Sequence, residues 1–368
     1  MKEKKRSLRK YKFVVVADTL RKRVLNGDYA FKSLPSERKL AAELGVNYMT
    51  VRQGLRILEA ENILIRQKNH RLMVKRAAQG EKPYFNLAFL APSFFLPNVE
   101  KWRTIIERQT RDLPCNVRPV LYMHWDDPIL MDVFAGFDGV FLYPIPEPVP
   151  DKVGYALRLP KHPIVVLGED FSAYGVPSIE LFQPSSIQKL LDHLLSLGHR
   201  RIGCFNTQPA HPEINERINQ WRYWMAAHQL EGELLDHSVV ARDSALIRAY
   251  QVMDNIYREG RPAETAWFCT TIPAAMGLAS ALRDHGLEPG KDVAVCSIDG
   301  EALASIFNPP LTSLESADPS PYVSICLKWL LNQNRGQSWQ GPLLMTPVDV
   351  PLVVRESTRP GVGRGVIE

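Results

Sequence analysis

The sequence has no long hydrophobic run. Its longest early apolar stretch, residues 13 to 17, is far shorter than the roughly 18 consecutive apolar residues of a membrane-spanning helix. It is also shorter than the apolar part of a secretory signal peptide. Neither an integral membrane protein nor an exported protein fits this pattern, so we predict a cytoplasmic protein without a membrane partner.

Cysteine is scarce, and its spacing does not suggest metal or disulfide chemistry. The chain has five cysteines, an odd number, and they are scattered and never form a C-x-x-C pair. None of the nine histidines lies in an H-E-x-x-H motif or another zinc-type spacing. We therefore expect reduced thiols, no metal site and no cofactor.

The chain also lacks a strong overall charge, but its net charge of +5 conceals an uneven distribution. Residues 1 to 82 contain 21 Lys and Arg against 8 Asp and Glu, a net charge of +13, whereas residues 83 to 368 carry −8. Such asymmetry is typical of a small nucleic-acid-binding unit attached to a larger acidic one. The alternative, a solvated basic tail, explains only the first ten residues, because basic charge continues through a periodic apolar pattern.

The basic part predicts three helices. Apolar residues at every fourth position predict an amphipathic helix over residues 14 to 25. Ser36 can cap the start of a second helix, and Asn47 can cap a third helix that runs to about residue 60. Gly45 lies between these two helices, where a tight turn needs positive φ.

The third helix has two distinct faces. The face that should be buried is apolar and comprises Val51, Leu55 and Leu58. The other face is basic and aromatic and comprises Tyr48, Arg52 and Arg56. Such a helix fits the major groove of DNA, where arginine can donate two hydrogen bonds to guanine. An ordinary surface helix with solvated arginines would have the same pattern.

The segment after the third helix favours DNA binding. Two short apolar runs, residues 63 to 65 and 72 to 74, flank a basic loop and predict a β-hairpin. Three helices and a basic hairpin make a winged helix-turn-helix, which we assign to residues 1 to 75. Residues 76 to 83 are small and polar and are predicted to be a linker.

The same stretch resembles the DNA-binding domain of GntR-type bacterial transcription regulators. The resemblance covers about residues 10 to 74 and is carried by the segments LPSERKLA and GVNYMTVR. It implies a double-stranded DNA partner. The residues that it places at the DNA are Arg38, Asn47, Tyr48, Thr50, Arg52, Lys68, Asn69, His70 and Arg71.

Beyond residue 84, strand-like apolar runs alternate with amphipathic helical patterns. This alternation predicts an α/β unit of parallel sheets with helices on both faces, long enough for two lobes. Ligands of such sheets bind at the carboxyl ends of the strands. The polar residues expected near those ends are Ser93, Asp170, Arg217, Thr271 and Asp299. Together they suit a polyhydroxylated ligand, although each one alone is better explained as a helix cap or a surface ion pair.

The large unit resembles the effector domain of LacI-type repressors. The segments LLDHLLSLGHRRIGCF, DVAVCSIDGEALASIFNPPLTSL and PLVVRESTRPG carry this resemblance. It implies a two-lobed periplasmic-binding-protein-like fold over residues 84 to 360, with a tail at residues 361 to 368. By this resemblance Asp170, Arg217 and Asp299 contact the effector. Two polar pairs of the family are replaced here by Thr271-Ile272 and Phe182-Gln183, so a less polar pocket is expected.

The sequence supports three hypotheses. The leading one is a homodimeric DNA-binding transcription regulator, a repressor that responds to a carbohydrate-like small molecule between the lobes; Trp267 is an additional candidate for stacking on that ligand. In the second, the large domain serves only dimerisation. The third is an aminotransferase-like domain that uses pyridoxal phosphate, but the chain has no recognisable lysine motif for that chemistry, so we predict no enzyme activity.

Overall fold

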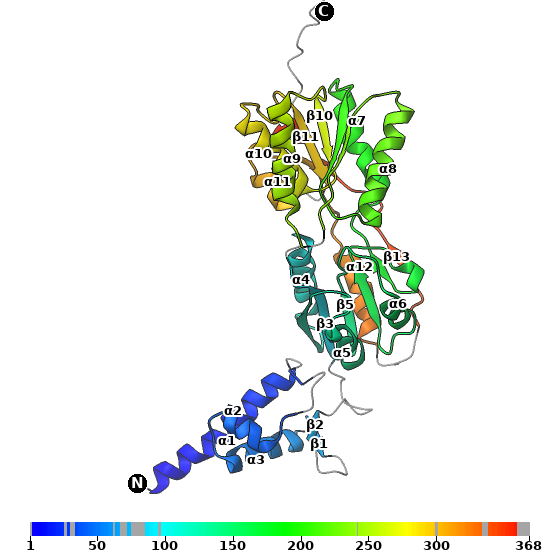
Figure 1. Ribbon diagram of the computed structural model, residues 1–368. Helices are drawn as coiled ribbons and strands as arrows, with labels where there is room; N and C mark the ends of the chain where they lie inside the picture. Colours follow the sequence, from blue (N-terminus) through cyan, green and yellow to red (C-terminus); the bar gives the residue numbers. More distant parts are fainter. Residues whose placement is uncertain are drawn as a thin grey trace, which may run out of the picture.

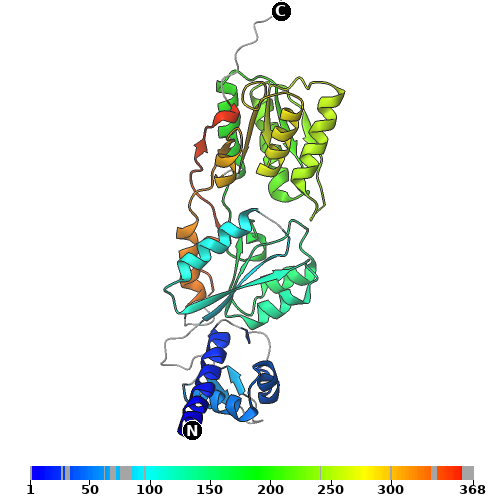
Figure 2. The ribbon, with the colours of Figure 1, turned by 90° about the vertical axis from the view of Figure 1, so that its left-hand side faces the viewer.

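The computed structural model describes residues 2–25, 28–29, 34–61, 63–66, 72–74, 85–94, 97–240, 242–298, 301–332 and 338–358. They form a small helical unit and two α/β lobes, which follow one another along the long axis of the molecule (Figure 1 and Figure 2). Within these ranges, no helix combines the length and the apolar character that crossing a bilayer requires.

The helical unit has the three helices and the hairpin that the sequence predicts. Its elements are α1 (Lys2–Leu25), α2 (Glu37–Glu43), α3 (Tyr48–Ala60), β1 (Leu64–Arg66) and β2 (Leu72–Val74). The two strands are antiparallel. Helix α1 begins at Lys2, so the basic segment that resembled a tail is helical.

A single apolar core holds the helical unit together. Its most buried side chains come from all three helices and include Leu20, Leu40, Val51, Leu55 and Leu58. Helix α3 lies very close to α1 at Gly54, where a Cβ atom would come within 2.8 Å of Val16 Cγ1. This contact fixes the depth at which α3 packs and therefore which of its faces stays exposed.

The start of α2 is capped as predicted. Ser36 Oγ accepts a hydrogen bond from the Lys39 N–H at 3.3 Å. We expect Ser36→Ala to lower the free energy of unfolding of the helical unit by about 1 kcal/mol, because one helical N–H loses its partner. Calorimetry of the full chain measures this change. Ser36→Asp keeps a capping oxygen and is the control; equal losses in both variants would contradict the role of the cap.

The first lobe is built on a six-stranded parallel sheet with the order β13-β7-β6-β5-β3-β4. Its strands are β3 (Phe85–Pro92), β4 (Cys115–Tyr122), β5 (Gly139–Leu142), β6 (Ile164–Leu167), β7 (Ser178–Ile179) and β13 (Leu344–Met345). Its helices are α4 (Pro97–Thr110), α5 (Pro128–Gly136), α6 (Asp151–Arg158) and α12 (Ser320–Leu330). Both faces of β3 are buried, since Phe89 and Leu90 belong to separate apolar clusters on either side of the sheet. Arg118 of β4 approaches the helical unit, with Nη1 at 3.3 Å from Asp28 Oδ1.

The second lobe repeats this plan with the order β14-β12-β11-β10-β8-β9, in which only β14 pairs antiparallel. Its strands are β8 (Ile202–Asn206), β9 (Leu234–Asp236), β10 (Ala266–Cys269), β11 (Ala294–Ile298), β12 (Thr312–Leu314) and β14 (Leu352–Val353). Its helices are α7 (Gln188–Ser196), α8 (Pro212–Ala227), α9 (Ala245–Glu259), α10 (Ile272–Asp284) and α11 (Glu301–Ile306). Short 3-10 turns lie at Ser172–Tyr174, Pro184–Ile187 and Glu356–Thr358.

The chain passes between the lobes at three places: after β7, after β12 and between β13 and β14. The sequence predicted the alternation of strands and helices that both lobes have. It missed β7, β9, β12, β13 and β14, which are two or three residues long. Such short strands have too few residues to display a period, so only the tertiary structure reveals where the chain changes lobe.

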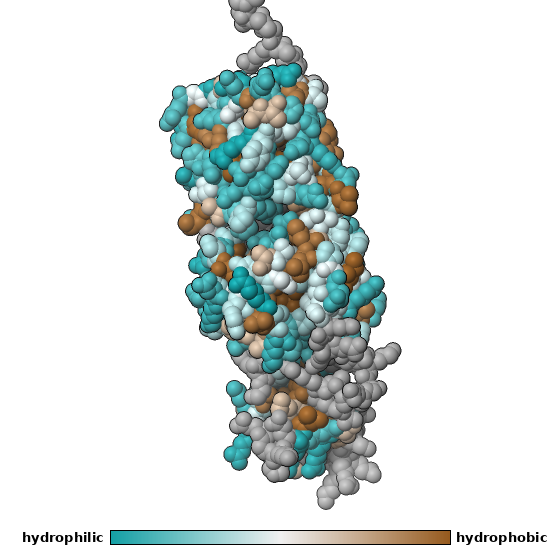
Figure 3. Space-filling model, turned by 90° about the vertical axis from the view of Figure 1, so that its right-hand side faces the viewer, coloured by the Kyte–Doolittle hydropathy of each residue, from teal (hydrophilic) through white to brown (hydrophobic). Residues whose placement is uncertain are grey.

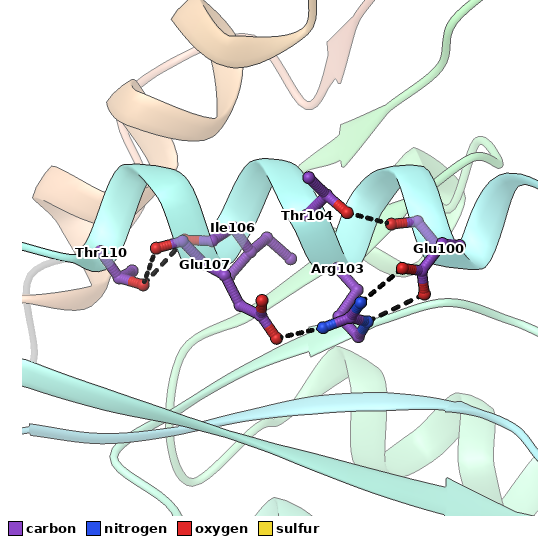
Figure 4. A network of polar contacts seen from close by, with 6 residues as sticks. All are labelled: Glu100, Arg103, Thr104, Ile106, Glu107 and Thr110. Atoms are coloured by element: carbon purple, nitrogen blue, oxygen red, sulfur yellow. Dashed lines mark hydrogen bonds and ion pairs between the residues drawn. The ribbon is translucent and has the colours of Figure 1, made fainter. Parts of the chain in front are cut away.

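Helix α4 covers one face of the first sheet with an apolar side and turns an ionic side outward. The buried side consists of Trp102, Ile105 and Ile106. On the outer side Arg103 lies between Glu100 and Glu107, with Nε at 2.9 Å from a Glu100 carboxylate oxygen (Figure 4). The outer face of the helix is therefore polar, and its charges are paired with one another along the helix.

Trp267 is a core residue, which corrects its interpretation as a stacking platform. Its side chain is fully buried next to Phe205, with ring centroids 6.4 Å apart. The neighbouring strand has Gly203 opposite, where a Cβ atom would lie 2.3 Å from the indole ring. The glycine thus makes room for the indole within the sheet, and no ligand can reach the ring.

Candidate nucleic-acid interface and ligand cavity

Helix α3 presents the two faces that the sequence predicts. The buried stripe is Val51, Leu55 and Leu58, and the exposed residues of the other face are Tyr48, Arg52 and Arg56. Arg38 and Asn47 are also exposed, whereas Thr50 is half-buried. The face is therefore open to a macromolecular partner while the opposite side anchors the helix.

The exposed side chains gather where α2 and α3 begin. A hydrogen bond from Tyr48 to the Glu37 carboxylate raises the pKa of the phenol, while the positive charges of Arg52 and Arg38 lower it. These four side chains are thus within electrostatic reach of one another. Asn47 Oδ1 caps α3 by accepting a hydrogen bond from the Met49 N–H at 2.8 Å, which leaves the amide NH₂ available to a partner.

The tip of the hairpin lies outside the described residues, and so do the four positions predicted there, Lys68, Asn69, His70 and Arg71. The strand before the tip is well anchored. Arg66 Nε lies 3.0 Å from a Glu59 carboxylate oxygen at the end of α3. The hairpin therefore leaves the helical unit from a defined point beside α3.

A cavity of about 130 Å³ lies between the two lobes. Its walls come from the carboxyl ends of β5, β6, β8 and β10 and from the helices that face them, as expected for parallel sheets. The lining residues are Asn98, Tyr143, Pro144, Pro146, Gly168, Glu169, Leu181, Phe182, Gln208, Pro209, His211, Glu213, Ile214, Arg217, Thr271, Ile272, Pro273 and Leu303. About half of these side chains are apolar.

The five predicted effector residues divide into three groups. Arg217 and Thr271 line the cavity. Ser93 and Asp170 do not: Ser93 is exposed, with Oγ against Met123 Sδ, and Asp170 is exposed and accepts a hydrogen bond from the Ser172 N–H at 2.8 Å. Asp299 lies outside the described residues. The carboxylate that faces the cavity after β6 is that of Glu169, one residue before the predicted one.

Arg217 is the most enclosed charge of the cavity. Only 3% of it is exposed, and it comes from the second turn of α8. Its guanidinium donates to the Thr270 carbonyl at 2.8 Å and pairs with Glu213, one turn earlier on the helix. Beside it, the Gln208 amide donates to Thr271 Oγ1 at 2.9 Å. The arginine is thus held in place by the protein before any ligand arrives.

A second ion pair crosses the cavity. His211 Nε2 lies 3.0 Å from Glu169 Oε2, and both side chains are largely buried. Burial raises the pKa of Glu169, and the histidine offsets only part of this rise. Burial by itself would lower the pKa of His211, but the hydrogen bond to Glu169 and the charges of Glu169 and Glu213 outweigh it and raise that pKa.

A further carboxylate, that of Glu180, lies near these charged side chains. Burial, together with the charges of Glu213, Asp170 and Glu169, raises the pKa of Glu180 to about 7.

Sequence reasoning missed Glu169, His211, Glu213 and Gln208. The rule that selected Asp170 and Thr271 could have found Glu169 and Gln208, because both lie two positions after the end of a strand. Nothing in the sequence pattern points to His211 or Glu213, which reach the cavity only because α8 starts there.

Family models match both parts of the chain. Residues 13–74 match the model described as bacterial regulatory proteins, gntR family. Residues 191–358 match the periplasmic binding protein-like domain. The first match covers the helical unit, and the second covers the second lobe together with the segments that return through the first.

Among curated proteins, the chain is similar to the HTH-type transcriptional repressor CytR of Escherichia coli strain K12. The two are 26% identical over 225 residues, which are 60% of this chain and 63% of CytR. The chain thus spans less than two thirds of the length of this relative.

Solved structures share the two-lobed fold. The Lac repressor dimer bound to operator and the anti-inducer ONPF has a TM-score of 0.58 and 20% identity, covering 76% of this chain and 95% of that one. A LacI family transcriptional regulator from Enterococcus faecium with bound ribose has a TM-score of 0.60 and 19% identity, covering 75% and 99%. Together with the two family matches, these likenesses show that the chain combines a GntR-type helix-turn-helix domain with a periplasmic-binding-protein-like domain of two-lobed, LacI-like fold.

Proposed function

We propose that this protein is a bacterial transcription regulator, a repressor whose affinity for operator DNA is set by a small molecule bound between its lobes. The observation that carries the proposal is the joining of an exposed basic face on α3 to a two-lobed unit with a cavity between its lobes. The similarity to the transcriptional repressor CytR supports the same function.

Operator recognition would use α3 and the hairpin. Arg52 and Tyr48 face the major groove in this proposal, with Arg38, Asn47 and Thr50 beside them and the tip residues 68 to 71 at the flanking backbone or groove. The net charge of +13 in residues 1 to 82 favours contact with phosphates. Binding should therefore weaken steeply as salt rises, since each phosphate contact releases counterions.

The effector would be compact. Cavities for drug-sized ligands occupy roughly 300–1,000 Å³, whereas this cavity measures about 130 Å³. The ring of Phe182 and the side chain of Ile272 offer an apolar wall, and Arg217 and Thr271 offer hydrogen bonds. A monosaccharide-sized ring with hydroxyls on its edge and one apolar face suits these walls, and the ribose-bound structural relative is in line with that size.

Linkage explains how such a ligand would act on DNA. A ligand that prefers one arrangement of the lobes shifts a dimer between geometries that do or do not match operator half-sites about 34 Å apart. A coupling free energy of about 1–3 kcal/mol gives a useful switch. The edge of the first sheet supports a dimer, because β4 is an edge strand and exposes Leu121, which is 60% accessible.

The apolar surface is otherwise dispersed. On the face drawn in Figure 3, brown residues lie in small separate groups among teal ones. That pattern is ordinary for a protein surface, and the side that the figure shows has no large apolar docking face.

The decisive experiment joins operator selection to a ligand screen. Random duplex DNA is selected on the full chain, and the selected operator is then titrated with a panel of pentoses, hexoses and nucleosides while DNA affinity is followed by fluorescence anisotropy. We expect two chains per operator and at least one ligand that changes the affinity 5- to 150-fold. Selection of no sequence would refute the DNA-binding proposal. Selection of an operator with no responding ligand would favour the large domain as a dimerisation module.

The enzyme-like alternative gains no support from the cavity. Among the described residues of its lining there is no lysine to form a Schiff base with pyridoxal phosphate. The absorption spectrum of the purified protein checks this point, since a visible Schiff-base band would contradict it.

A further inference from the structure

The Glu169–His211 pair joins the two lobes directly. Glu169 follows β6 of the first lobe, whereas His211 precedes α8 of the second. Their side chains meet at 3.0 Å at the wall of the cavity, and both are largely enclosed, with 15% and 11% of the side chain exposed. Opening the cleft would separate them, because nothing along the chain holds them near each other.

We propose that Glu169 and His211 form a clasp that positions the lobes around the effector, and that closing the cavity takes up a proton at this clasp. The proposal rests on the proposed function for the identity of the cavity as an effector site. The clasp consists of these two residues only, and they act as positioning residues.

Charged groups around the clasp come from both lobes. Glu213 and Arg217 of α8 face His211, but they are paired with each other. On the first lobe, Glu180 and Asp170 add negative charge near Glu169. Tyr122 lies within reach of Glu169 and stays neutral, since burial raises its pKa well above the ordinary value. The surroundings are therefore acidic on balance and favour a proton on the pair.

The direction of the pH dependence follows from linkage. In an open cleft both side chains return to water and to their ordinary pKa values, near 6.5 for histidine and 4.3 for glutamate. In the closed structure both pKa values are raised, so the closed form binds protons more tightly than the open form. Closure is thus strongest below pH 6.5 and weakens as pH rises through the raised pKa of His211, by up to tenfold in the closing equilibrium per pH unit.

A second contact across the cleft provides a reference that does not titrate in this range. Arg242 donates to the Met123 carbonyl at 3.0 Å, on the side of the β4 and β9 edges. Arginine keeps its charge at all relevant pH values. Any pH dependence of closure between pH 6 and 8 must therefore arise elsewhere. The clasp joins the lobes directly, and Glu180 of the first lobe, with a pKa of about 7, contributes in the same direction.

Closure can be measured without knowing the effector. The five native cysteines are buried, so Lys152→Cys on α6 and Ala226→Cys on α8, both exposed, accept a donor and an acceptor dye. Labelled full-length chain is diluted into an excess of unlabelled chain, so that each dimer carries one dye pair. Energy transfer is then recorded from pH 6 to 8 in the absence of ligand.

We expect energy transfer to fall as pH rises in the unsubstituted protein and in the control His124→Gln, which alters an exposed histidine of the first lobe. His211→Gln and Glu169→Gln should each give a clearly smaller slope, which is the part that Glu180 contributes. The exchanged pair Glu169→His with His211→Glu should restore the slope, which a merely structural role would not do. Circular dichroism and a cooperative melt show that each variant is folded.

Two results would overturn the clasp. One is a flat profile in the unsubstituted protein, and the other is an unchanged slope in His211→Gln and Glu169→Gln. If either single variant failed to fold, the exchanged pair alone would be measured. Energy transfer that falls with rising pH would then support the clasp, and energy transfer that does not change with pH would overturn it. Operator binding is measured separately, so a failed clasp leaves the proposed function standing, and a failed operator selection leaves the closure measurement valid.

Discussion

Replacing Arg52 by alanine is expected to weaken binding to the selected operator 5- to 150-fold, and to leave the melting temperature unchanged. The side chain is exposed on the face of α3 opposite the buried stripe, so its loss removes no core contact. A bidentate arginine–guanine contact contributes about 1–3 kcal/mol of discrimination. Anisotropy titrations against the operator and against random duplex of equal length measure both affinity and specificity.

Two variants separate the possible roles of Arg52. Arg52→Lys keeps the charge but loses the planar fork, so it should retain affinity for random DNA while losing preference for the operator. Gln53→Ala, at an exposed position on the same helix, is the control and should bind normally. Unchanged operator affinity in Arg52→Ala would remove this residue from the interface.

Replacing Arg217 by alanine is expected to abolish the effector response and to lower the free energy of unfolding by about 2 kcal/mol. The loss of stability arises because the Glu213 carboxylate and the Thr270 carbonyl lose a buried partner. Removing one partner of a buried ion pair usually costs about 2–5 kcal/mol. We expect a cost at the lower end of this range, since a quarter of the Glu213 side chain is exposed. Calorimetric unfolding measures the loss of stability, and ligand titration of the operator complex measures the effector response.

The controls for Arg217 separate stability from ligand contact. Arg222→Ala lies on the exposed side of the same helix and should change neither quantity. Arg217→Ala combined with Glu213→Gln removes the unpaired charge and should recover part of the stability, while the effector response stays lost. A normal response in that double variant would exclude Arg217 from the effector site. Operator affinity without ligand should be unchanged in all three, because α8 and α3 belong to different units of the molecule (Figure 1).

The helical unit could be predicted almost completely because its signals are local. Ser36 and Asn47 cap the helices that they precede, and Gly45 has the positive φ, 61°, that the turn between them requires. The apolar period of α3 also predicts which side is buried. Only the start of α1 differed, since a run of basic residues contains no signal that separates a solvated helix from a tail.

The cavity was harder to predict because neighbouring residues differ in direction. Asp170 and Glu169 both follow β6, but Asp170 bonds to the backbone of its own turn, and Glu169 faces the other lobe. The course of a single turn decides between them. Trp267 illustrates the same limit, since its burial depends on Gly203 of another strand, 64 positions earlier in the chain.

By itself, the sequence determined the division into a basic helical unit and an acidic two-lobed unit. Net charge and hydrophobic period are summed over many residues, so an error at a few positions does not change them. It also determined the face of α3 that remains exposed. Only the tertiary structure decided which side chains share the cavity and that Glu169 meets His211 across it. The physical reason is distance along the chain: the chain changes lobe at three places, and no periodic pattern encodes which residues those crossings bring within 3.0 Å of each other.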